Sequence, residues 1–405
     1  MTVSVVIPVK DAGPGFADLL DSLRRQKGFR DIELVVVDSR STDGSVGVAR
    51  RYGAKVLEIL PEEFSHSYAR NLGAEHASGD VLLFTVQDAL PPGDTWLAEM
   101  SAPLVHDGVA AASCVEHPRA DADLFYQVLL WNHRRYLELD RGDRITSKPN
   151  TDDPDALRKS AQLTDVACLI WRDLFLRYRH RGDYAEDLDL GLRLIRDGHR
   201  LALLGSTRIV HSHTRAPSYH LKRSYVDTLA LLRLLPTHPR LTIDSERLFA
   251  GIVAAAGALE SVVEDRLRGL RTPIGVAELA DALRGAFAHE LGRQPGPLRL
   301  ATPHLADDAF IEFLRAIEGE ALDPCAVGEP VGVLAAVRCV VDLGLEYLQT
   351  AHQFVDAPLL AEVYRFGWKA LALQSGSHLA HCVAGGSDQT RERLRRLDRQ
   401  LIGNV

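Results

Sequence analysis

The sequence predicts an α/β domain with a mostly parallel sheet, followed by an all-helical domain. In residues 1–210, short apolar runs alternate with helix patterns, which is typical of parallel strands covered on both faces. After about Leu221 the strand pattern stops and only helix patterns follow. The length of 405 residues suits two or three domains of roughly 100–200 residues each. We therefore expect one domain over residues 1–224 and a second over residues 225–405.

The first strand is predicted at Val3–Val9, a nearly unbroken β-branched run that a Gly-Pro-Gly turn follows closely. The next helix is predicted from apolar residues at the i, i+3, i+4 and i+7 spacing, namely Phe16, Leu19, Leu20 and Leu23. Three more strands are predicted at 33–38, 54–60 and 81–86, with a helix before each of the last two. Sites in such sheets lie at the carboxyl ends of strands, which makes Asp38 and Asp88 candidate site residues.

The second domain is predicted as seven helices separated by breaks that contain proline or glycine. They are expected at Tyr225–Leu235, Ser245–Leu267, Val276–Leu291, Asp308–Glu318, Val331–Gln349, Pro358–Leu373 and Gln389–Leu401. Their apolar faces are more typical of a core than of a cofactor site, and a surplus of such surface could pair subunits. The last helix is rich in arginine, which indicates a solvated charged face, with a lipid-binding patch as the alternative.

Composition excludes several classes of protein. With 46% hydrophobic and 25% charged residues, the chain is neither a disordered protein nor a collagen or coiled-coil rod. A net charge of −8 makes it a poor binder of duplex DNA, so we expect no nucleic-acid partner. Five cysteines without a C-x-x-C pair argue against a disulfide framework and favour a reducing cytoplasm. We expect a soluble cytoplasmic protein, with peripheral contact at the inner face of a membrane as an open alternative.

Two consecutive strands end in acidic loops, at Lys10-Asp11 and at Asp38 with the polar turn after it. A carboxylate at a strand end can accept a hydrogen bond from the N–H of a nucleotide base, while the loop backbone presents donors to ribose or phosphate. The alternative is that Asp38 and Ser41 only cap the following helix. Because two consecutive strands end in such acids, we favour nucleotide binding over helix capping as their role.

Arg70 and Asp88 are candidates for contact with a diphosphate and its metal ion. Arg70 lies on the helix before the fourth strand, and a guanidinium suits a diphosphate. Its alternative is a surface arginine paired with Glu75 or Asp80. The fourth strand delivers Asp88 to a turn, where its hard oxygen atoms suit Mg²⁺ or Mn²⁺ on a nucleotide diphosphate. Its alternative is a turn-forming aspartate.

Two acids and two histidines complete the candidate residues. Glu186-Asp187 opens a helix, where the dipole keeps a carboxylate ionised and suited to act as a general base. The alternative is the ordinary preference of a first helical turn for acids. His211 and His213 are two residues apart on an extended segment, so they share one face and both could approach a metal. The alternative is that one of them has a structural role.

In combination, these motifs resemble the inverting family 2 glycosyltransferases of the GT-A fold, closest to the bacterial rhamnosyltransferase-like branch. The resemblance covers residues 1 to about 225. Residues 70–79 follow the pattern R-N-x-G-A-x-x-A-x-G, and Gln87-Asp88-Ala89 stands where other members have D-x-D. Val86 takes the place of the first acid of that motif.

The resemblance implies a role for each matching residue. Asp187 would be the base that deprotonates the acceptor hydroxyl. A divalent ion, Mg²⁺ or Mn²⁺, would be held by Asp88 together with His211 or His213. The remaining candidates would bind the nucleotide sugar: Pro8, Val9, Asp11, Asp38, Arg70, Gln87, Lys222 and Arg223.

The activity implied is the inverting transfer of a sugar from a nucleoside-diphosphate sugar to an acceptor hydroxyl, as in polysaccharide biosynthesis. The acceptor would be a saccharide, a lipid-linked molecule or a small molecule, with the helical domain shaping its side of the cleft or an oligomer contact. Processive members carry Q-x-x-R-W, which residues 219–225 do not match, so we expect non-processive transfer. The alternatives are a non-catalytic nucleotide-sugar-binding or scaffold protein, and a sugar nucleotidyltransferase, for which residues 10–15 are too broken by proline.

Overall fold

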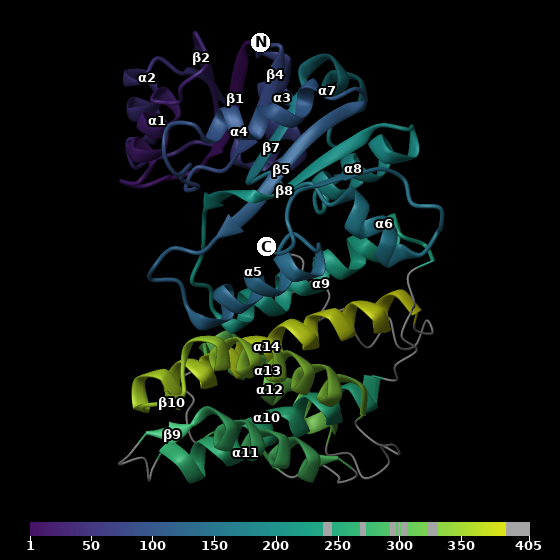
Figure 1. Ribbon diagram of the computed structural model, residues 1–405. Coiled ribbons are helices and arrows are strands. Elements are labelled where there is room, and N and C mark those ends of the chain that lie inside the picture. Colours follow the sequence, from purple (N-terminus) through teal and green to yellow (C-terminus); the bar gives the residue numbers. More distant parts are fainter. Residues whose placement is uncertain are drawn as a thin grey trace. The chain divides into compact units, whose positions relative to one another are not determined.

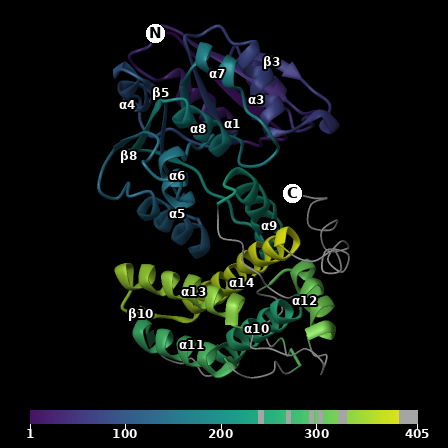
Figure 2. The same cartoon turned by 90° about the vertical axis from the view of Figure 1, so that its right-hand side faces the viewer.

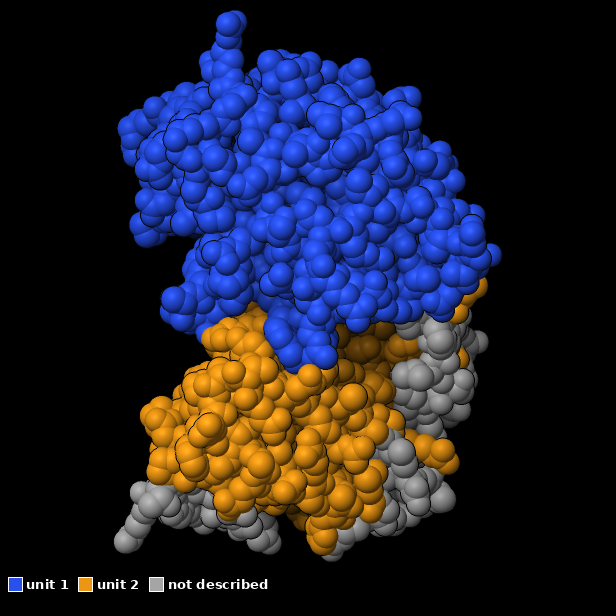
Figure 3. Space-filling model, in the orientation of Figure 1, with its two compact units in different colours: residues 1–122, 130–213 blue, residues 123–129, 214–405 orange. Residues whose placement is uncertain are grey.

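The computed structural model describes residues 1–237, 245–267, 273–291, 297–298, 300, 306–321 and 331–385 of the chain. The predicted arginine-rich helix at Gln389–Leu401 lies outside these residues. The chain divides into two compact units (Figure 3). Unit 1 contains residues 1–122 and 130–213, and unit 2 contains residues 123–129 and 214–405.

Unit 1 is built on an eight-stranded sheet with the order β3-β2-β1-β4-β7-β5-β8-β6 (Figure 1). The strands are β1 (Val3–Val9), β2 (Ile32–Asp38), β3 (Lys55–Glu58), β4 (Val81–Thr85), β5 (Val109–His117), β6 (Arg144–Thr146), β7 (Ala167–Trp171) and β8 (Arg200–Val210). Strands β1 to β4 are parallel, β5 is parallel to β8, and β7 runs antiparallel to both of its neighbours. The strand order reverses beside β1, and ligands of open α/β sheets bind at such switch points.

Helices cover both faces of this sheet. Successive side chains of β1 point to opposite faces, and the apolar ones on each face pack against a helix. Val5 and Ile7 join the core that contains the apolar face of α1, whereas Val6 faces α3. At Gly73 a Cβ atom would lie 2.4 Å from Cγ1 of Val6, so glycine allows α3 to approach the sheet. The helices within residues 1–213, of which α5 begins in unit 2, are α1 (Phe16–Arg24), α2 (Ser45–Arg51), α3 (His66–Glu75), α4 (Trp96–Ser101), α5 (Leu124–Tyr136), α6 (Pro154–Ala161), α7 (Arg172–Tyr178) and α8 (Glu186–Arg196).

Unit 2 is helical. Its elements are α9 (Pro217–Leu234), α10 (Ser245–Leu267), α11 (Val276–Glu290), α12 (Asp308–Ala321), α13 (Val331–Ala351) and α14 (Ala357–Gly385), with β9 (Ile274–Gly275) and β10 (Phe354–Val355). Helix α14 packs against α9, α10 and α13 (Figure 2). The side chains of Tyr364 and Trp368 on this helix are buried. None of the described helices combines the length and apolar character needed to cross a membrane.

Residues 123–129, at the start of α5, belong to unit 2 and make side-chain contacts within it. Asp123 accepts a hydrogen bond from the buried Lys369 ammonium group. The ring of Phe125 lies 4.5 Å from that of His220 and 5.6 Å from that of Phe366. Burial, followed by the charge of Lys369, lowers the pKa of His220 to about 4, so this imidazole is neutral in the folded unit.

The predicted fold class is confirmed: a mostly parallel sheet with helices on both faces, followed by a helical region. Two details differ. The β9–β10 pair makes unit 2 not entirely helical, because two short segments from distant parts of the chain pair as strands. Helix α9 begins at Pro217 rather than Tyr225, since proline at a first helical position suits the backbone there.

Candidate functional site

The loops after β1 and β2 are joined through their polar side chains. Oδ1 of Asp11 accepts a hydrogen bond from the backbone N–H of Thr42 at 2.6 Å, and Oγ of Ser41 accepts one from the N–H of Asp11 at 2.8 Å. The bond from Thr42 lowers the pKa of Asp11. Asp11 adopts a φ of 43°, a left-handed backbone that this local bonding supports. The predicted acid therefore lies at the switch point and shapes its loop.

Asp38 is almost fully buried at the end of β2, with 1% of its surface exposed. Its Oδ2 accepts a hydrogen bond from the N–H of Ser41 at 3.0 Å, whereas its Oδ1 has no hydrogen-bond partner among the described residues. Helix α2 begins later, after Gly44, which rules out the alternative that Asp38 is its N-cap. A buried carboxylate oxygen without a hydrogen bond costs folding free energy. A ligand that donates a hydrogen bond to Oδ1 would remove this cost, so Oδ1 is suited to ligand binding.

Gln87 ties the end of β4 to the end of β1. Its Oε1 accepts a hydrogen bond from the N–H of Lys10 at 2.8 Å, and its Nε2 donates one to the carbonyl of Lys10 at 3.0 Å. The amide is thus occupied by backbone, and its predicted contact with a nucleotide sugar stays a prediction. Of the two predicted residues in β1, Val9 is buried in the apolar core and Pro8 is half-buried.

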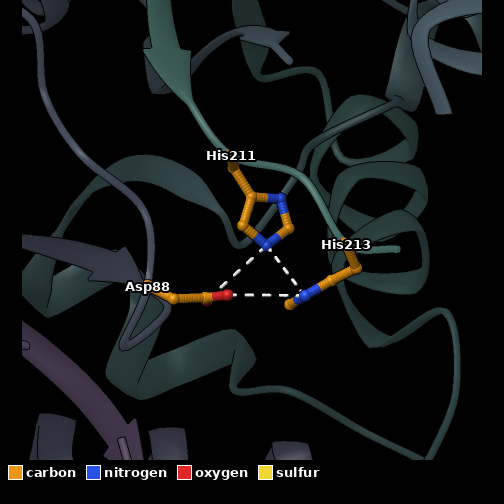
Figure 4. A group of neighbouring side chains, drawn as sticks. All are labelled: Asp88, His211 and His213. Atoms are coloured by element: carbon orange, nitrogen blue, oxygen red, sulfur yellow. Dashed lines mark hydrogen bonds and ion pairs between the residues drawn. The ribbon is translucent and has the colours of Figure 1, made fainter. Parts of the chain in front are cut away.

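Asp88, His211 and His213 come together at the carboxyl ends of β4 and β8 (Figure 4). Two backbone hydrogen bonds between Leu90 and Val210, of 2.8 and 3.0 Å, bring the turn of Asp88 against the end of β8. His211 Nε2 lies 3.6 Å from Asp88 Oδ1, and His213 Nδ1 lies 3.5 Å from Asp88 Oδ2. The Nε2 atoms of the two histidines are 3.1 Å apart.

This donor set fits a divalent cation. One ligand atom from each of the three residues lies within 4.8 Å of the other two. One carboxylate and two imidazoles suit Mn²⁺ and related ions, which accept both oxygen and nitrogen ligands. The structure therefore places both histidines at Asp88, where the resemblance required only one of them.

Two residues absent from the predicted set support this cluster. Glu116 at the end of β5 lies 2.8 Å from Nδ1 of His211, and a carboxylate in this position turns Nε2 toward a metal. Burial raises the pKa of Glu116, but its contact with His211 outweighs that effect and leaves the pKa lowered. Arg119 donates hydrogen bonds to the carbonyls of Asp88 and Ser212. The position of Glu116 near the end of a strand could have identified it from the sequence, but strand β5 itself was not predicted.

Arg70 lies in a buried ion cluster with only 3% of its surface exposed. Its Nη1 donates a hydrogen bond to Oε1 of Glu186 at 2.8 Å, and its Nε lies 3.3 Å from Oδ2 of Asp165. The predicted surface pairing with Glu75 or Asp80 is therefore wrong. The predicted diphosphate contact is also disfavoured, because the guanidinium is already committed to two carboxylates inside the fold.

Asp187 occupies the first turn of α8 and is partly exposed. Its Oδ1 accepts a hydrogen bond from the N–H of Leu188 at 2.7 Å. Burial, and then the charges of Asp165 and Glu186, raise the pKa of Asp187 to about 7. A carboxylate with a pKa near neutrality is a stronger base than an ordinary aspartate, which is the property that general-base catalysis uses.

Lys222 and Arg223 lie on α9 in unit 2. Arg223 Nε donates a hydrogen bond to Oδ2 of Asp227, one turn later on the same helix, at 2.9 Å. Their predicted contact with a diphosphate stays a prediction.

Comparison with known proteins finds a family match for the first part of the chain. Residues 4–161 match the model of glycosyl transferase family 2. This matching region, which is less than half of the chain, is a glycosyl transferase family 2 region. The match spans β1 to α6 and thus includes Asp11, Asp38, Arg70 and Asp88, whereas Asp187 and the two histidines lie beyond it. The match agrees with the predicted family and enzyme class, and the mostly parallel sheet confirms the predicted α/β class.

Two curated relatives are O-antigen chain rhamnosyltransferases. WbaN of Salmonella anatum is 25% identical over 230 residues, covering 56% of this chain and 70% of that protein. RfbN of Salmonella typhimurium is 24% identical over 233 residues, covering 56% and 71%. Among solved structures, mannosyltransferase PcManGT of Pyrobaculum calidifontis, in complex with GDP-Man and Mn²⁺, aligns with a TM-score of 0.44 at 20% identity, covering 91% of this chain and 86% of that one.

Proposed function

We propose that this glycosyltransferase moves a sugar from a nucleoside-diphosphate sugar to an acceptor hydroxyl with inversion at the anomeric carbon, in a metal-assisted and non-processive reaction. The observation that carries this proposal is the convergence of Asp88, His211 and His213, with Glu116 behind His211. The names of the curated relatives make rhamnose the first candidate sugar and polysaccharide biosynthesis the first candidate process.

On the donor side, the chain's own residues would recognise the nucleotide. The buried Oδ1 of Asp38 is an acceptor suited to the N–H of a base. Asp88, His211 and His213 would hold a divalent ion, which when bound neutralises charge on the leaving diphosphate. Asp11 would keep the loops after β1 and β2 together beside the nucleotide, through its hydrogen bond with the N–H of Thr42.

On the acceptor side, Asp187 would remove the hydroxyl proton as the oxygen atom forms its bond to the anomeric carbon. The bond to the diphosphate breaks on the opposite face, so configuration inverts and one carboxylate base suffices. The raised pKa of Asp187 fits this role. Family membership argues against the scaffold and nucleotidyltransferase alternatives.

Three further parts of the proposal concern the rest of the chain. Unit 2 would serve acceptor binding or assembly without taking part in the chemistry. The acceptor would be a saccharide, a lipid-linked molecule or a small molecule. We place the reaction in the cytoplasm, with peripheral contact at the inner face of a membrane and homo-oligomer formation as open alternatives.

Isothermal titration of the full chain with UDP and GDP, each with and without Mn²⁺, tests the metal site. We expect Asp88→Ala to abolish the dependence of binding on Mn²⁺ and His211→Ala to weaken it. His106→Ala, a change at an exposed histidine of the same unit, is the matched control and should behave as the wild type. Undiminished Mn²⁺ dependence in Asp88→Ala would refute the proposed site. Hydrolysis assays with GDP-mannose, UDP-glucose and nucleoside-diphosphate rhamnose then identify the donor.

A further inference from the structure

Four buried charged or titratable side chains lie beneath the start of α8. They come from four different segments: Arg70 from α3, Asp165 from the turn before β7, His180 from the segment after α7, and Glu186 from the first turn of α8. Their exposed fractions are between 3% and 8%. They are therefore too deep in the fold to contact an acceptor, and any effect they have on the reaction acts through Asp187.

Asp165 is the centre of this cluster. Its Oδ2 lies 3.3 Å from Nε of Arg70 and 3.1 Å from Nε2 of His180. Arg70 in turn donates to Glu186 at 2.8 Å, and Nδ1 of His180 lies 3.3 Å from the carbonyl of Glu186. Asp165 thus holds both of the side chains that hold Glu186.

We propose that Asp165 is a positioning residue for the transfer reaction: by holding Arg70 and His180 it fixes Glu186, and so keeps the neighbouring Asp187 in the place and charge state that a base needs. This inference rests on the proposed function, in which Asp187 is the base. Asp165 itself touches no reacting atom.

The charges in the cluster support the proposal. Asp165, Glu186 and Asp187 supply three carboxyl groups, and Arg70 supplies one permanent positive charge. Buried carboxylates in excess of their partners are costly, so the group most weakly compensated retains a proton to higher pH. Asp165 lies beside both Arg70 and His180, whose charges lower its pKa. The pKa values of Glu186 and Asp187 are instead raised by burial and by the negative charge of Asp165.

The backbone before α8 is held by the same helix that supplies Arg70. The Asn71 amide donates to the carbonyl of His180 and accepts from its N–H, both at 3.0 Å. Ser67 Oγ donates to the carbonyl of Gly182 at 2.5 Å. In this way the R-N motif of α3 supports the segment that leads to Asp187.

The charges around Asp187 predict opposite effects for different substitutions. The groups that act on it are Arg70 from α3, Asp165 from the turn before β7 and Glu186 from α8, and the charges of His66 and His180 act on Asp165. Asp165→Asn removes a negative charge, so Asp187 should ionise at lower pH. Glu186→Gln should act in the same direction, and Arg70→Gln should act in the opposite one.

The test is the pH profile of kcat/KM of the full chain from about pH 5 to 9, with the donor that hydrolysis assays identify. We expect the acidic limb to move down by about one pH unit in Asp165→Asn and in Glu186→Gln, and up in Arg70→Gln. Titration of the carboxyl groups by ¹³C NMR, assigned with Asp187→Asn, gives the same readout without any substrate. A general loss of folding would not shift the limb in two directions.

Asp189→Asn is the matched control, because this acid lies on the same helix but pairs with Arg193 at 2.7 Å. It should leave the limb in place. If the acidic limb of the pH profile stays in place in both Asp165→Asn and Glu186→Gln while Asp187→Asn is inactive, the positioning role of Asp165 is overturned. Asp187 would then remain the proposed base. Near wild-type turnover in Asp187→Asn would instead overturn the proposed base. If Asp165→Asn does not fold, Arg70→Gln and Glu186→Gln decide together, because Asp165 is proposed to act through both residues. An acidic limb that neither variant moves would overturn the proposal.

Discussion

Asp187→Asn should make the protein more stable above neutral pH while it removes activity. In the folded chain the pKa of Asp187 is raised from 3.8 to about 7, first by burial and then by Asp165 and Glu186. A carboxyl group with a raised pKa binds its proton more tightly in the folded than in the unfolded state. Its ionisation therefore destabilises the fold increasingly as pH rises from about 4 to about 7. Asparagine has nearly the same shape and cannot ionise.

The size of the effect follows from the shift. One pKa unit corresponds to about 1.4 kcal/mol, so a shift of about three units sets an upper limit of about 4 kcal/mol at pH 8. Because Glu186 also retains a proton to higher pH, it relieves part of this cost. We expect the free energy of unfolding of Asp187→Asn to exceed that of the wild type by at least about 1 kcal/mol at pH 8 and by almost nothing at pH 4. Transfer should fall by roughly 10²-fold or more, the usual contribution of a general base.

Urea denaturation of wild type and variant at pH 4 and pH 8, followed by circular dichroism, measures the difference. Asp189→Asn is the control, since its carboxylate pairs with Arg193 and its removal should give no gain at pH 8. A variant that is less stable than wild type at pH 8, or equally stabilised at both pH values, would refute the reasoning. Retained transfer in Asp187→Asn, with loss in Glu186→Gln, would move the base to Glu186.

Three further changes test the surrounding structure. Glu116→Gln should weaken Mn²⁺ affinity by roughly 10–100-fold in calorimetry, and unchanged affinity would contradict its role behind His211. Gly73→Ala should lower the free energy of unfolding in urea by about 1–3 kcal/mol, because the new Cβ meets Val6. Gly47→Ala is the control and should have little effect, since its Cβ would make only an ordinary contact with the end of a flexible arginine. Gln87→Ala should weaken nucleotide binding by loosening the end of β1 from the end of β4, with thermal stability measured alongside.

Local sequence patterns predicted much of unit 1 and its chemistry. The apolar runs of β1, β2 and β4 are buried as expected, because a strand covered on both faces needs apolar side chains at successive positions. The carboxyl ends of parallel strands meet at one edge of a sheet, so the strand pattern alone was enough to place Asp11 and Asp38 close together. His211 and His213 share a face for a similarly local reason, the two-residue period of an extended chain.

The tertiary structure decided which partners these residues have. Arg70 could be read as a surface residue because Glu186 is 116 positions away, and a contact at that separation leaves no local pattern. The same holds for Glu116, which lies 95 positions from His211, and for Gln87, which lies 77 positions from Lys10. Sequence alone therefore determined which strands and loops carry the acids and histidines. Only the packing of α3 and α8 against the sheet, and the place of β5 within it, decided which side chains are buried. Burial and the charged neighbours of Asp187 then set its pKa.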